Sequence, residues 1–140
     1  MLNRFCGMPI ILIVGLAAFS LHHVQISGAD GKPTVTSIAK QEKAIAEEAL
    51  KRLTDPEARG QDSVGDLAKW SRRLVEATRK SGASNADFVA AIEQHIARMD
   101  ARVKAVRQLH EAALMTHCDL LDAEYEALEA KAWLLDEQRK

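Results

Sequence analysis

The stretch that decides the fold is residues 109–124, LHEAALMTHCDLLDAE. One helical pattern ends near Ala113, and a second begins just after Thr116. Asp119 follows Thr116 by three residues, the spacing at which a hydroxyl and a carboxylate cap the first turn of a helix. The stretch therefore predicts a tight turn between two helices.

Apolar residues recur at helical spacing on both sides of this turn. Upstream, the spacing alternates between three and four residues from Val89 to Ala113. Downstream, one helix carries two neighbouring apolar rows. The rows are Cys118, Leu121, Tyr125, Leu128, Ala132, Leu135 and Leu120, Ala123, Ala127, Ala130, Leu134. Two rows on one helix need more than one partner helix, so we expect a helical bundle or an oligomer.

The first half of the chain has a similar organisation. Helical spacing over residues 37–53 and 63–81 is interrupted by Pro56 and Gly60. Gly82 is suited to the left-handed position that follows a helix, and Ser84 with Asp87 caps the next one. Ser63 with Asp66 predicts a similar cap for the second helix.

A faint internal repeat relates the two halves. Asp66-Leu67 matches Asp119-Leu120 at an offset of 53 residues, and the helix segments before each turn match at an offset of 56. We therefore expect two helical hairpins in tandem, residues 37–81 and 84–140.

Composition supports an all-α fold of about four helices arranged as a coiled-coil-like bundle. Aromatic residues make up 4% of the 140 residues, whereas Ala, Leu, Glu, Lys and Arg dominate. The formal net charge of −1 comes from interspersed charges of both signs, so the electrostatic footprint of a nucleic-acid-binding protein is missing.

The first 29 residues have the pattern of a signal peptide. An apolar run over residues 9–21 is shorter than the span of about 20 residues that crosses a membrane. Small residues end at Ala29, which predicts cleavage before Asp30 and a polar lead-in over residues 30–36. An uncleaved N-terminal anchor is the alternative. We expect export to the periplasm or cell envelope, where Cys118 would be the one cysteine of the mature chain.

Residues 110–130 resemble the periplasmic-tip helical hairpin of the TolC-type outer-membrane efflux protein family. That pattern contains an aromatic residue, a glycine, a Ser or Thr and an Asp-x-Leu-x-Ala run. In this sequence His110 stands at the aromatic position and Ala113 at the glycine. Thr116 matches the Ser/Thr. The run is matched by Asp119, Leu121 and Ala123, followed by Leu128 and Ala130.

The resemblance implies a tip that meets the hairpins of a periplasmic adaptor protein. The tip residues would be Ala113, Leu114, Met115 and Thr116 with Asp119 and Asp122. The family counterparts of the two aspartates line a channel entrance. Full members of the family are several times longer and carry the strands of a membrane barrel. The sequence shows no strands of alternating polarity, so the resemblance implies a tip module without a pore.

His110, His117 and Cys118 also suggest a zinc or copper site, because imidazole and thiolate are the ligands these metals prefer. Their spacing favours packing, since His117 and Cys118 are adjacent and point to different helix faces. We expect Cys118 to be a buried small apolar residue. No catalytic motif or cofactor site stands out. The sequence thus predicts a non-enzymatic helical protein that acts by protein contact or self-association. The alternative is a small periplasmic metal- or stress-responsive binding protein.

Overall fold

The structure is a computed structural model that describes residues 33–55 and 63–140. This part of the chain forms four helices: α1 (Val35–Thr54), α2 (Ser63–Lys80), α3 (Asn85–Glu111) and α4 (His117–Gln138). The predicted all-α fold is confirmed for these residues. The predicted signal peptide and the loop containing Pro56 and Gly60 lie outside them.

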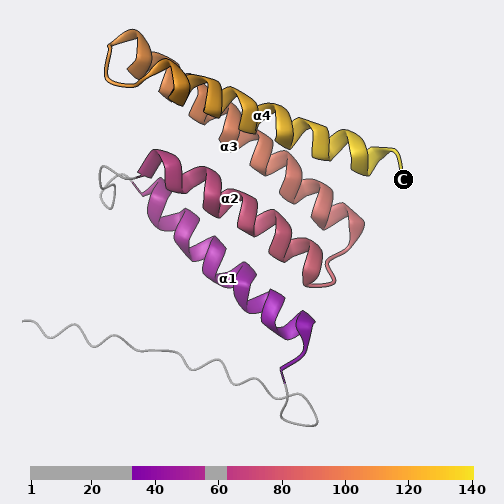
Figure 1. Ribbon diagram of the computed structural model, residues 1–140. Coiled ribbons are helices and arrows are strands. Elements are labelled where there is room, and N and C mark those ends of the chain that lie inside the picture. The colour runs from indigo at the N-terminus through magenta and orange to yellow at the C-terminus, as the bar shows by residue number, and fades with distance from the viewer. Residues whose placement is uncertain (1–32, 56–62) are drawn as a thin grey trace, which may run out of the picture.

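The helices pack in chain order, α1 against α2, α2 against α3, and α3 against α4. Figure 1 shows two antiparallel hairpins side by side, with α1 and α4 on the outside. The end of α1 and the start of α2 lie at the same end of the molecule as the turn between α3 and α4. The inner helices α2 and α3 each pack against two neighbours in chain order, and α4, which packs mainly on α3, also contacts α2.

Local hydrogen bonds explain where most helices begin. Thr116 caps α4 in a reciprocal box with Asp119, and Ser84 accepts a hydrogen bond from the backbone N–H of Asp87, as predicted. Helix α1 begins at Val35, two residues earlier than the apolar pattern predicted. The reason is a capping box in which Thr34 pairs with Ser37, a residue less usual in that place than Glu. The residue before α2 lies outside the described residues, so the Ser63 cap stays a prediction.

Two helices end in a left-handed residue. Gly82 follows α2 with a φ of 76°, as its position predicted, and glycine adopts that backbone without steric cost. Ala113 follows α3 with a φ of 57°. Helix α3 therefore stops at Glu111, and the apolar pattern that continued to Ala113 overestimated its length.

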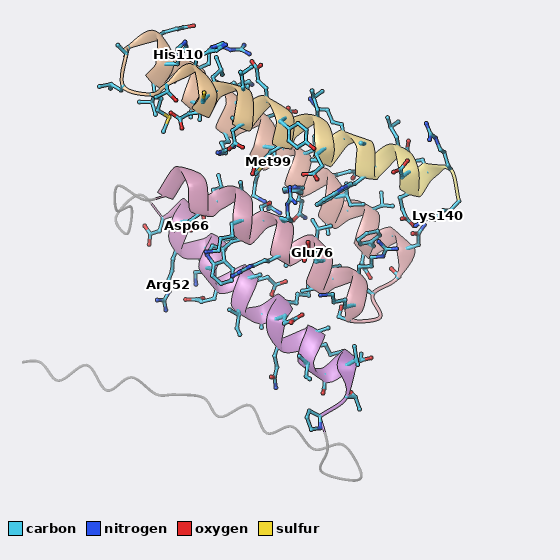
Figure 2. All side chains as sticks on the ribbon, in the orientation of Figure 1. Arg52, Asp66, Glu76, Met99, His110 and Lys140 are labelled. Atoms are coloured by element: carbon cyan, nitrogen blue, oxygen red, sulfur yellow. The ribbon has the colours of Figure 1, made fainter. Side chains whose placement is uncertain are left out.

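In the part of the chain that the structure describes, two small apolar clusters hold the buried faces of the helices together. Ala46, Leu50 and Leu74 join α1 to α2. The second cluster joins α2, α3 and α4 and contains Ala68, Met99, Ala127 and Ala130. Met99 is fully buried and lies in the middle of the bundle (Figure 2). Alanines at these contacts let the helix axes approach closely, so the core is thin and leaves little room for a large internal site.

Candidate contact surface

The turn between α3 and α4 is closed by a complete Schellman motif. The backbone N–H of Ala113 donates to His110 O at 2.9 Å, and that of Leu114 donates to Leu109 O at 2.8 Å. This motif needs a left-handed residue at Ala113, the position where the efflux-tip pattern has glycine. A methyl group at this backbone conformation costs about 1 kcal/mol relative to glycine. The chain thus forms this turn with alanine at a position where glycine would be more favourable.

The residues predicted to form a tip do lie around this turn, with one exception. Leu114 is 73% exposed at its apex, and Met115 is half-buried. Asp119 accepts hydrogen bonds from the backbone and side chain of Thr116, which hold its pKa below the usual value. Its carboxylate therefore serves to cap α4. Asp122 lies one turn further along the helix and pairs with Arg102 of α3 at 3.2 Å.

Two of the three predicted metal ligands meet at the turn. The rings of His110 and His117 lie 5.6 Å apart, and His110 Nδ1 is 3.0 Å from Met115 O. Within the part of the chain that the structure describes, no three His, Cys, Asp or Glu side chains converge as metal ligands. Cys118 is exposed, so its predicted burial was wrong. The sequence located the apolar row to which Cys118 belongs but could not show that this row faces outward.

That row forms the outer face of α4 and contains four of the large apolar side chains that are exposed on the described surface. All six of its members are exposed, and Tyr125 and Leu128 are 67% and 66% exposed. We call this set the outer row: Cys118, Leu121, Tyr125, Leu128, Ala132 and Leu135. With 3.6 residues per turn, it lies roughly opposite Ala123, Ala127 and Ala130, which are buried against the rest of the bundle.

Charged pairs fix α4 on α3 along both sides of the buried alanines. Arg102 is buried and donates to Glu126 at 2.6 Å as well as to Asp122. Burial raises the pKa of Glu126, and the positive charge of Arg102 acts against that rise. On the other side, Lys131 pairs with Asp100 at 2.9 Å and Arg107 with Glu124 at 2.8 Å. These contacts determine which face of α4 remains outside.

The two hairpins meet through a polar cluster that sequence reasoning missed. Ser71 Oγ of α2 lies 2.8 Å from His95 Nδ1 of α3 and accepts from Arg98 Nε at 2.7 Å. The ring of Trp133 of α4 stacks on His95, and Arg72 of α2 lies over Trp133 and pairs with Glu129. The cluster thus links α2, α3 and α4. Its members lie far apart in the sequence and follow no known motif, so no local signal could have identified them.

The polar cluster holds His95 in its neutral form. Burial, reinforced by the positive charges of Arg98 and Arg72, lowers the pKa of His95 from 6.5 to about 4. Burial also lowers the pKa of Arg98, whose Nη2 atom is buried without a hydrogen-bond partner among the described residues. In hydrolases a Ser–His pair is oriented by a carboxylate and is open to substrate. Here Ser71 is fully buried and its further partner is an arginine, which suits a structural contact.

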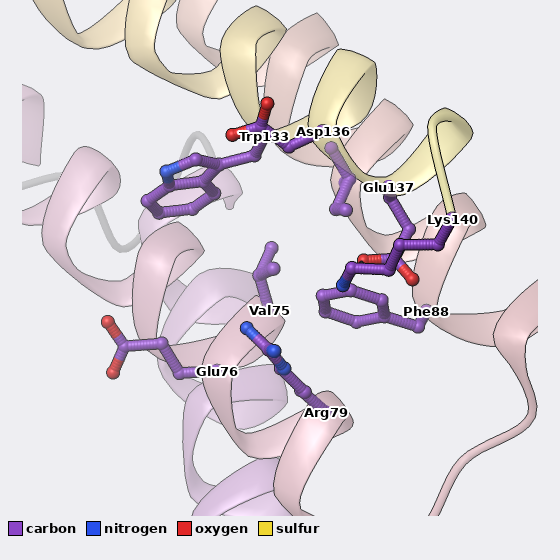
Figure 3. Close-up of a pocket in the computed structure, with 9 residues that line it drawn as sticks. Val75, Glu76, Arg79, Phe88, Trp133, Asp136, Glu137 and Lys140 are labelled. Atoms are coloured by element: carbon purple, nitrogen blue, oxygen red, sulfur yellow. The ribbon is translucent and has the colours of Figure 1, made fainter.

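A groove of about 480 Å³ opens between α2, α3 and α4, at the end away from the α3–α4 turn. Its apolar lining comes from the buried Val75 and Ile92 and from the rings of Phe88 and Trp133. Figure 3 shows Val75 between these two rings. The rim of the groove carries charges of both signs, from Glu76, Arg79, Asp136, Glu137 and Lys140. Such a rim favours neither an anionic nor a cationic ligand.

Comparisons with models of known protein families, with characterised proteins and with solved structures find no match. No helix in residues 33–55 and 63–140 combines the length and apolar character needed to cross a membrane. The geometry therefore defines a class only by its architecture: two helical hairpins joined by a polar cluster and a small apolar cluster, with an apolar row on the outer face of the last helix.

Proposed function

We propose that this chain is an exported, non-enzymatic helical-hairpin protein that acts by contact with other protein surfaces in the cell envelope. The observation that carries the proposal is the outer row of α4. Leu121, Tyr125 and Leu128 are all more than half exposed although they have the spacing of a packed helix seam. Single exposed apolar residues are ordinary, but a continuous row supports a protein-binding surface.

The turn between α3 and α4 offers a second, smaller contact point. Leu114 lies in the turn with 73% of its surface exposed, two residues before Thr116, which caps α4. The resemblance of residues 110–130 to an efflux tip supports a partner among envelope components, and the pattern of residues 1–29 supports export. In an exported chain, the N-terminal residue of the mature protein should be Asp30.

Site-specific photocrosslinking in cells tests the contact function. A photoreactive amino acid at Leu128 or Leu114 should give a discrete crosslinked protein band. The same group at Glu93, an exposed polar position on α3, is the matched control and should give none. The absence of a band from both Leu128 and Leu114 would contradict the proposal.

The pair of rings at the turn supports a weaker second candidate, a small periplasmic metal-binding protein. His110 and His117 are close enough that a small rotation could direct both imidazoles at one zinc or copper ion, with Cys118 beside them. Titration of the purified protein with each metal decides this question. Binding that His117→Ala does not weaken, or no binding at micromolar metal, would exclude the site.

A further inference from the structure

The outer row of α4 has the residue order of a coiled-coil seam. In heptad notation, Leu121, Leu128 and Leu135 occupy every d position, and Cys118, Tyr125 and Ala132 occupy the a positions. Each side chain at an a or d position of a coiled coil fills a hole formed by four residues of the facing helix, and leucine at d is typical of two-stranded parallel coiled coils. The outer row is thus suited to packing against another helix.

The first hairpin shows how the equivalent face of its second helix is used. At the repeat offset of 53 residues, Ala68 and Val75 of α2 correspond to Leu121 and Leu128 of α4. Ala68 and Val75 are 4% and 3% exposed, because α2 lies between α1 and α3. Helix α4 contacts α3 and α2 on its buried side, whereas the outer row on its opposite side is exposed among the described residues. Leu121 and Leu128 of the outer row therefore correspond to two positions that α2 buries, whereas Arg72 and Arg79, the counterparts of Tyr125 and Ala132, are half-buried and exposed.

Building on the contact function proposed above, we propose that a second copy of this chain covers the outer row. The two α4 helices would pair through their outer rows as an antiparallel, two-stranded coiled coil. The resulting dimer is symmetric and closed, because the same surface of both copies is used and no further row remains for a third α4.

The volumes of the seam residues favour the antiparallel direction. Around a two-fold axis near Tyr125 and Leu128, each large side chain meets a different residue of the second copy, and the small Ala132 meets a leucine. A parallel pair would place Tyr125 against Tyr125 and Ala132 against Ala132, which crowds one layer and leaves a gap in another. The antiparallel layers are Cys118 with Leu135, Leu121 with Ala132, and Tyr125 with Leu128.

The charges beside the seam are compatible with the same direction. On one flank, Glu124 would lie near Lys131 of the second copy, and this attractive pair occurs twice in the dimer. On the other flank, Asp122 would lie near Glu129 of the second copy. Each of these two carboxylates already has an arginine beside it, Arg102 or Arg72. The flanks thus offer two opposite-charge and two like-charge contacts, and all four kinds of group already have a partner within the chain. The charges therefore permit the antiparallel direction, and the volumes of the seam residues favour it.

Point substitutions distinguish this dimer from other assemblies. Sedimentation of the purified protein should show a monomer–dimer equilibrium in the micromolar range. Leu128→Glu should weaken dimerisation at least about tenfold, because it places a charge in the central layer of both copies. The matched control is Ile45→Glu, which changes an apolar side chain of α1 that is 58% exposed and should leave the equilibrium unchanged. Equal loss in both variants would instead indicate head-to-tail packing of α4 on α1 and overturn the proposal.

Disulfide trapping tests the direction of the pair. The sequence has a second cysteine, Cys6, within the predicted signal peptide, and Cys6→Ser removes it from the full-length protein. With Leu135→Cys added, mild oxidation should give a covalent dimer in which Cys118 is joined to the introduced cysteine of the second copy. Cys118 alone should crosslink far more slowly, and Cys118→Ser combined with Leu135→Cys should not crosslink efficiently. Rapid oxidation of Cys118 alone would show a parallel pair and contradict the proposed arrangement.

The two proposals can fail separately. If the protein is monomeric at all concentrations and Leu128→Glu has no effect on sedimentation, the self-association proposal is wrong. The contact function still holds in that case if photocrosslinking from Leu128 captures a different protein. If crosslinking captures only a second copy of this chain, both proposals are supported by the same surface.

Discussion

Helices α2 and α4 are the second helices of their hairpins, yet they differ in what their two faces contact. Helix α2 is covered on both faces, and its face toward α3 carries the small or polar residues Ala68, Ser71 and Val75. The face of α4 that carries its alanines is packed against the rest of the bundle. The opposite face carries leucines and a tyrosine and is exposed. In α4, the larger apolar side chains are therefore on the exposed face, and the smaller ones are on the buried face.

This difference separates two tasks that helix surfaces perform. The contact between the hairpins combines a small apolar cluster with directional groups, such as Ser71 with His95, which favour one relative placement of the hairpins. The outer row relies on apolar area, which stabilises contact but is less directional. The inner contact is suited to fixing the arrangement of the hairpins, and the outer row to association. Four predictions test this comparison.

The largest effect should come from removing the arginine that holds α4 on α3. Arg102→Ala should lower the free energy of unfolding by about 3 kcal/mol, since Glu126 would then be partly buried without its counterion. Urea denaturation at neutral pH measures this change. The control is Arg107→Ala, whose ion pair with Glu124 is exposed, and we expect a loss below about 1 kcal/mol. Equal losses would mean that the burial of Arg102 is not important for stability.

The contact between the hairpins should weaken in acid through His95. Its pKa is about 4 in the folded protein and 6.5 without the fold, so the unfolded chain binds the additional proton between these values. The contribution of His95 is complete above pH 6.5 and is lost as the pH falls toward 4, by about 3 kcal/mol in total. Chemical denaturation across this range should show a steeper decline for the wild type than for His95→Gln. If the stability of both proteins fell equally with pH, His95 would be excluded as the cause of the acid sensitivity.

A matched pair of alanine substitutions compares the two helices directly. Val75→Ala in α2 should cost about 2 kcal/mol of stability, because a buried side chain loses its apolar contacts. Leu128→Ala at the equivalent position of α4 should change the stability of the monomer by less than about 0.5 kcal/mol. Both are measured by urea denaturation at a protein concentration too low for association. A large loss for Leu128→Ala under these conditions would show that the outer row is covered within one chain.

The smallest effect concerns the turns next to these helices. Ala113→Gly should stabilise the protein by up to about 1 kcal/mol, since glycine adopts the left-handed backbone without strain. The reverse substitution, Gly82→Ala at the left-handed position that follows α2, should destabilise the protein by a similar amount. Thermal unfolding measures both changes in stability, which should have opposite signs. A destabilising Ala113→Gly would show that the unfolded-state entropy of glycine outweighs the strain.

The sequence was sufficient to predict the helices where a local signal marks their ends. Thr116 with Asp119 and Gly82 are such signals, and the structure confirms each. The start of α1 was misplaced because the partner of Thr34 is Ser37, whose hydroxyl replaces the more familiar carboxylate. Local hydrogen bonding thus determines helix boundaries, and unusual capping residues are where sequence-based prediction is weakest.

The candidate surface was only partly predictable. The sequence gives both apolar rows of α4, but helical spacing does not say which row finds a partner within the chain. Cys118 was consequently expected to be buried. The cluster around His95 depends on contacts across 24 residues or more, and no single helix contains its pattern. The packing of the helices against one another determines both which row of α4 is buried and which side chains surround His95.

Ala113 also determines where the second hairpin opens most readily. Its backbone strain is released only when the turn unwinds, and the exposed Leu114 contributes little packing to prevent that opening. Backbone amides around the turn should therefore exchange hydrogen with solvent through local fluctuations. Amides near Ala127 and Ala130, in the middle of α4, should exchange only when the whole domain unfolds. The hairpin then has a fluctuating end at Leu114 and a rigid shaft behind it, so a partner that captures Leu114 would bind the segment that costs least to rearrange.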